Sequence, residues 1–107
     1  MAYDEGLAER IRAELAGVDV AEKKMFGGVA FLERGNMLVG VTGSDLMARV
    51  GPDATDDALA RPGARLFDMS GRPMRGWVVV DAAVLDDATL ATWIDDARRF
   101  VAMLPPK

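Results

Sequence analysis

Two segments with helical periodicity flank a middle region of short apolar runs broken by glycine and proline. In residues 4–16, apolar side chains recur at a spacing near 3.6, which predicts an amphipathic helix with Asp4 as its N-cap. Residues 86–104 have the same pattern and begin with two aspartates suited to capping a helix. Because each helix has a single apolar stripe, both are expected to pack on one face of a sheet.

The middle region has the composition of β-strands joined by tight turns. Val, Phe, Met and Leu cluster in runs that end at Gly, Pro, Asn or Asp, and the run from Trp77 to Val80 is the strongest β segment. Strands are expected at 22–33, 37–41, 46–50, 65–69 and 75–81, with a short helix at 55–60. The order α-β-β-β-α-β-β-α predicts an α+β fold with a mainly antiparallel, five-stranded sheet and helices packed on one face.

Gly35-Asn36 separates two apolar runs and predicts a hairpin with a two-residue turn. With that turn, Leu32 lies opposite Val39 on the side that faces the core. Phe31 then lies opposite Gly40 on the other side, where its ring can cover a strand position that has no side chain.

The chain has 107 residues, a size that fits a single domain spanning 1–107, and contains neither histidine nor cysteine. The usual general base, thiolate chemistry and zinc-thiolate sites are therefore excluded, and the sequence signals no enzyme activity, cofactor or metal. A net charge of −4 disfavours direct nucleic-acid binding. The N-terminus lacks a signal-peptide pattern and no run is long enough to span a membrane, so a cytoplasmic location is expected.

The stretch KKMFGG, from Lys23 to Gly28, combines two cations, two large apolar side chains and a glycine pair. A phosphate-binding loop places its lysine after the glycines and before a helix, whereas here the lysines come first and a strand follows. The pattern favours a bulge or sharp bend at Gly27-Gly28 within the first strand, anchored by Met25 and Phe26. Lys23 and Lys24 can serve as a charged strand edge or contact a partner.

A second dense stretch, Arg72 to Trp77, holds two arginines and an aromatic ring close to glycine and proline. Arginine binds planar anions through paired hydrogen bonds and stacks on aromatic rings, so this stretch can bind a partner; a tight hairpin with solvated charges explains the same residues. The candidate partner-binding residues are Lys23, Lys24, Arg49, Arg72, Arg75 and Trp77. The binding interpretation requires these side chains to gather on one face of the sheet.

Four segments of the chain resemble the N-terminal domain of the TfoX/Sxy family. They are the K-x-M-F-G-G element at 23–28, the hairpin AFLERGNMLVGV, the strand LMARVG, and GRPMRGWVVVD at 71–81. The resemblance implies a topology similar to secretion-chaperone-like α+β folds. Full-length members are regulators of natural competence that assist a cyclic-AMP-dependent activator and carry a second, helical domain. The resemblance therefore implies a single-domain member lacking that C-terminal domain, and it supplies no catalytic motif.

Two hypotheses follow from the sequence. The first is a non-catalytic protein-interaction module, with transcription machinery or a regulator as its partner, that uses the KKMFGG bend, the Arg72 to Trp77 hairpin and the open sheet face. The second is a binder of a small anionic ligand or nucleic acid through basic residues clustered on the sheet face. A homodimer through a strand edge or the sheet face is compatible with either hypothesis.

Overall fold

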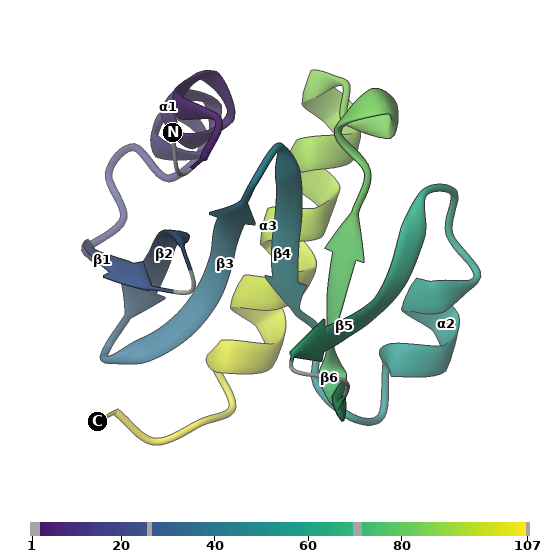
Figure 1. The fold of residues 1–107 in the computed structure, drawn as a ribbon. Coiled ribbons are helices and arrows are strands. Elements are labelled where there is room, and N and C mark those ends of the chain that lie inside the picture. The colour runs from purple at the N-terminus through teal and green to yellow at the C-terminus, as the bar shows by residue number, and fades with distance from the viewer. Residues whose placement is uncertain (1–2, 26, 70–71, 107) are drawn as a thin grey trace.

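The computed structural model of the chain describes residues 3–25, 27–69 and 72–106 (Figure 1). Its elements, in chain order, are α1 Glu5–Glu14, β1 Val20–Met25, β2 Gly28–Glu33, β3 Asn36–Thr42, β4 Asp45–Arg49, α2 Thr55–Leu59, β5 Ala64–Met69, β6 Arg72–Val80, the 3-10 turn η1 Ala82–Val84, and α3 Asp87–Val101. Aspartate side chains cap both long helices: Asp4 accepts a hydrogen bond from the Leu7 amide, and Asp86 accepts one from the Thr89 amide. The predicted helix starts are therefore confirmed.

The strands form one six-stranded sheet in the order β1-β2-β3-β4-β6-β5, and each neighbouring pair is antiparallel. The α+β class is confirmed, but the expected count of five strands is wrong. The segment predicted as one strand bent at its glycines is two strands, because the chain reverses between Met25 and Gly28, which lie opposite each other. Gly27, with φ of +73°, permits this two-residue reversal.

The register of the β2–β3 hairpin differs from the prediction by two residues beside the turn and by one residue farther along the strands. Arg34 and Gly35, with φ of 54° and 80°, form the turn, which places Leu32 opposite Met37 instead of Val39. The pairing then shifts by one residue between Phe31 and Leu32, so Phe31 lies opposite Val39 and Ala30 lies opposite Gly40. Phe31 is consequently in the main core instead of covering Gly40.

Contacts with the end of α3 explain this register. The Arg34 guanidinium donates to the Val101 carbonyl oxygen at 2.7 Å, which holds a non-glycine residue in the left-handed region. Asn36, only 2% exposed, donates from its side-chain amide to the Pro105 carbonyl oxygen at 2.9 Å. A turn at Gly35-Asn36 would place Asn36 outside the strand, so these hydrogen bonds favour the observed pairing.

All three helices contribute to a single core on one face of the sheet, and α3 runs behind β3 and β4 (Figure 1). Trp93 and Phe31 are the largest fully buried side chains in this core. The opposite face carries a smaller apolar cluster made only of strand residues, namely Met37, Met47, Phe67, Trp77 and Val79. Within the described residues, no helix combines the length and apolar character needed to cross a bilayer.

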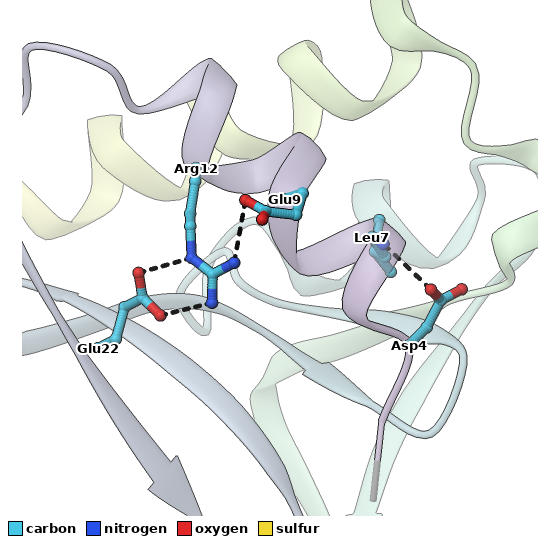
Figure 2. A network of polar contacts seen from close by, with 5 residues as sticks. All are labelled: Asp4, Leu7, Glu9, Arg12 and Glu22. Carbon is cyan, nitrogen blue, oxygen red and sulfur yellow. Dashed lines mark hydrogen bonds and ion pairs between the residues drawn. The ribbon is translucent and has the colours of Figure 1, made fainter. Parts of the chain in front are cut away.

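An ion-pair network joins α1 to the edge strand β1 (Figure 2). The Arg12 guanidinium donates two 2.8 Å hydrogen bonds to the Glu22 carboxylate and contacts Glu9 at 3.1 Å. These hydrogen bonds raise the pKa of Arg12, and the bonds from Arg12 lower the pKa of Glu22. The network therefore stabilises the helix-to-sheet connection whenever Glu22 is ionised.

Replacing Glu22 by Gln should reduce stability in a pH-dependent way. Because the pKa of Glu22 is depressed in the folded state, its contribution is complete above the ordinary value of 4.5 and is lost as the pH falls through the folded value. The pair is partly exposed, so the loss near pH 7 should be at most about 1 kcal/mol. Urea unfolding at pH 7 and pH 3 measures this, with Glu14→Gln, an exposed position on the helix that carries Arg12, as the matched control. A Glu22→Gln effect that does not shrink at pH 3 would contradict the ion-pair explanation.

Replacing Gly28 by Ala should destabilise the fold far more than the same change at Gly27. A Cβ at Gly28 would lie 1.8 Å from the Val41 carbonyl oxygen, a backbone atom that cannot move without separating β2 from β3. Overpacking of this kind costs about 3 kcal/mol or more, whereas Gly27→Ala meets open space and costs only the roughly 1–2 kcal/mol of positive φ. Chemical denaturation of the two variants checks the order, and equal losses would refute the close-approach role of Gly28.

Candidate functional site

The predicted basic surface is divided between two parts of the sheet. Lys23 and Lys24 are exposed on the edge strand β1, whereas Arg49 lies on β4 and Trp77 on β6. Three strand spacings separate β1 from β4, which is roughly 14 Å. Neighbouring β-strand side chains also point to opposite faces, so the two lysines do not share one face. The six candidate residues therefore do not form a single patch.

The signature glycines have a structural role in the β1–β2 reversal. Gly27 is in the turn, and Gly28 is buried where β2 passes close to β3. The predicted anchoring by Met25 and Phe26 lies outside the described residues, since the structure describes only the backbone of Met25 at the end of β1. Arg72 is the first residue of β6 and pairs with Met69, while its side chain is also outside the described set.

Arg49 and Trp77 do lie together, directly opposite each other on β4 and β6. The guanidinium carbon of Arg49 is 5.5 Å from the centre of the Trp77 ring and 5.5 Å from that of Phe100 on α3. These distances are within the range of cation–π attraction. We call Arg49, Trp77 and Phe100 the arginine–aromatic cluster.

Arg49 lacks a polar partner in this cluster. It is half-buried, and burial lowers the pKa of its guanidinium. Its side chain makes no ion pair and no hydrogen bond with any residue in 3–25, 27–69 or 72–106. A half-buried cation without a counter-ion has donors available for an anionic partner.

Arg75, the other described arginine of the dense stretch, is engaged elsewhere. It is exposed and lies 3.4 Å from the Asp56 carboxylate at the start of α2. The pair is long and solvated, so it contributes little to stability. Arg75 belongs to an irregular part of β6, where the pairing with β5 shifts between Leu66 and Phe67.

Thr55 positions the elements around the arginine–aromatic cluster. Its buried hydroxyl donates to the Gly51 carbonyl oxygen at 2.8 Å and accepts from the Gly76 amide at 2.9 Å. The Gly76 carbonyl oxygen in turn accepts from the amides of Val50 and Gly51. Thr55 does not cap α2, because Ala54 occupies the N-cap position without a side-chain hydrogen bond. Thr55 instead ties the end of β4 to β6.

An open pocket of about 400 Å³ lies between α2 and α3, beside the cluster. Phe100 belongs to both, and a Cβ at Gly51 would lie 2.4 Å from its ring, so the ring packs directly on the backbone of Gly51. Met103, 74% exposed, stands among the lining residues. We call this space the α2–α3 pocket. Sequence reasoning missed it, since its walls come from residues 50–61 and 96–103, which no local motif connects.

The charged groups at the α2–α3 pocket are partly paired with one another. Asp96 accepts from Arg61 at 2.7 Å and from Arg99 at 3.0 Å, and Arg61 also lies 3.6 Å from the centre of the Trp93 ring. Asp53 and Asp57 line the pocket without a partner among the described residues. No group of three or more described acidic side chains is arranged to hold a metal ion.

The segments that form the β1–β2 reversal, the β2–β3 hairpin and the β6 irregularity are those that resemble the TfoX/Sxy family. The model of the TfoX N-terminal domain matches residues 13–101, most of the 107-residue chain. The chain belongs to the TfoX N-terminal domain family. Neither a curated protein nor a solved structure is significantly similar to it.

The matched region of this TfoX N-terminal domain contains the whole arginine–aromatic cluster and the Thr55 contacts. Most of α1, from Glu5 to Arg12, precedes the matched region, and Met103 follows it. The cluster is therefore part of the family domain itself.

Replacing Thr55 by Val in this TfoX N-terminal domain should destabilise it strongly. The change keeps the side-chain shape but leaves the Gly51 carbonyl and the Gly76 amide without their hydrogen bonds in a buried position. The expected loss is about 2–4 kcal/mol, whereas Thr55→Ser keeps the hydroxyl and should lose about 1 kcal/mol with its methyl group. Equilibrium unfolding in urea distinguishes the two, and a Val variant as stable as the Ser variant would rule out the hydroxyl's role.

Proposed function

We propose that this TfoX N-terminal domain is a non-catalytic protein-interaction module that acts as a regulatory accessory protein. The resemblance to competence and transcription regulators supports the regulatory part of the proposal. The absence of histidine and cysteine from the sequence supports a role in binding rather than catalysis. Its docking surface consists of the arginine–aromatic cluster and the α2–α3 pocket.

The position of Arg49 is the main observation that supports the proposal. Interface energy is concentrated in arginine and aromatic residues beside pockets, and Arg49, Trp77 and Phe100 supply this combination at one end of the sheet. The α2–α3 pocket adds apolar surface, including the exposed Met103. The KKMFGG segment lies away from this docking surface, because Lys23 and Lys24 are on the edge strand β1, three strands from Arg49 on β4.

The alternative of a nucleic-acid binder receives less support. Phosphate binding depends on several cations along one surface, and the lysines of β1 are three strands away from Arg49. The chain's net charge of −4 also opposes approach to a polyanion. A protein partner requires only the local combination of one cation and adjoining apolar surface.

Affinity capture from an extract of the source cells tests the proposal at physiological salt. The wild-type chain should recover a specific protein, and Arg49→Gln and Met103→Asp should each reduce its recovery about tenfold, because both changes fall on the docking surface. The double change Lys23→Gln with Lys24→Gln is the matched control and should leave recovery unchanged. Unfolding curves verify that the variants remain folded.

Three results would argue against the proposal. These are recovery of no protein, recovery that depends on the lysines instead of Arg49, and recovery of nucleic acid alone. Binding should then be repeated with the purified partner, so that a direct contact is separated from an indirect one.

A further inference from the structure

We propose that Arg49 is an anchor for a carboxylate, and that an acidic residue of the partner binds it while a neighbouring apolar side chain enters the α2–α3 pocket. The inference rests on the proposed function, since it names the chemistry of the partner segment at the same surface. It goes further by predicting which two groups the partner must present together.

Arg49 differs from the other arginines in the contacts of its guanidinium. Every other arginine whose side chain the structure describes already has a polar partner. Arg34 donates to backbone carbonyls, and carboxylates contact Arg10, Arg12, Arg61, Arg65, Arg75, Arg98 and Arg99. In this set, Arg49 alone has no hydrogen bond or ion pair, and its guanidinium lies beside aromatic rings instead. In a chain with 17 acidic residues, this unpaired cation needs an explanation beyond a shortage of carboxylates.

The geometry of a guanidinium explains which ligand fits. When its flat face lies over a ring, its N–H donors at the rim stay available for hydrogen bonds in the guanidinium plane. A carboxylate presents two oxygens in one plane and can accept two parallel hydrogen bonds from that rim. Trp77 and Phe100 restrict Arg49 before binding, which reduces the conformational entropy lost when the carboxylate arrives.

The α2–α3 pocket restricts the rest of the ligand. Phe100 contributes to the pocket wall and to the Arg49 contact, so the two parts of the surface adjoin at this ring. Arg61 and Arg99 are already paired with Asp96, so they offer less to a second anion. Asp53 and Asp57, which also line the pocket, repel a second anion. The segment that fits carries a single carboxylate at Arg49 and an uncharged, apolar side chain in the pocket.

NMR titration of the full chain, labelled with ¹⁵N and with ¹³C in the Met methyl groups, tests this pairing. The main probe is the blocked dipeptide acetyl-Leu-Glu-amide, and its matched control is acetyl-Leu-Gln-amide, which lacks only the charge. The Glu peptide should shift both the Arg49 Nε–H and the Met103 methyl signals, with an affinity about tenfold above that of the Gln peptide. Acetyl-Gly-Glu-amide should lose the Met103 shift.

Protein variants separate the anchor from general electrostatics. Arg49→Lys keeps the charge but loses the planar pair of donors, so it should weaken binding of the Glu peptide several-fold. Arg75→Lys, which changes a nearby arginine engaged with Asp56, should leave binding unchanged. Met103→Gln changes the pocket wall at an exposed position where folding is not at risk, so it tests whether the Leu side chain of the peptide contacts the pocket.

Equal binding of the Glu and Gln peptides would overturn the inference. So would binding of inorganic phosphate at Arg49 that exceeds binding of the peptide, since the ligand would then be a small anion. If partner capture depends on Met103 but the Glu peptide has no preference for Arg49, the inference fails while the protein-interaction function stands. If the Glu peptide binds as expected but no protein is captured, the carboxylate anchor stands and the proposed function fails.

Discussion

The hydroxyl of Thr55 is the contact on which the geometry of the candidate site depends. It accepts from one strand and donates to the loop after another, so β4, β6 and the start of α2 share a single buried oxygen atom. Gly51 and Gly76, with φ of +88° and +98°, supply the backbone conformations that bring these segments together. Trp77 follows Gly76 directly, and Phe100 packs on Gly51, so both rings near Arg49 are positioned by this arrangement.

Local sequence signals predicted the features that depend on contacts between residues close together in the sequence. The capping aspartates Asp4 and Asp86 identified the starts of the long helices, since a cap involves residues only a few positions apart. The glycine pair after Met25 was ambiguous, because positive φ serves a bend within a strand and a reversal between two strands equally well. The hairpin register was beyond local reasoning, because Arg34 is held by Val101, which lies far along the chain.

Only part of the candidate site could be predicted from the sequence, for the same reason. Arg49 and Trp77 were identified from their residue types and are neighbours across two strands. The lysines were grouped with them on sequence grounds alone, and the strand order separates the two groups. Phe100 lies within the segment 86–104 that was predicted as an amphipathic helix, and its part in the pocket depends on how α3 packs against α2 and the end of β4. Residues far apart in sequence meet there only in the folded chain.

An acidic chain that binds a carboxylate must do so through short-range contacts. The net charge of −4 repels an anionic partner at a distance, so electrostatic steering cannot accelerate the encounter. At physiological ionic strength the Debye length is about 8 Å, which screens the exposed acids from an approaching carboxylate. A half-buried guanidinium beside aromatic rings is screened much less, so its attraction remains at contact. Specificity then comes from the apolar pocket next to Arg49, because a carboxylate alone gains little, whereas a carboxylate with a correctly placed apolar neighbour fills both parts of the surface.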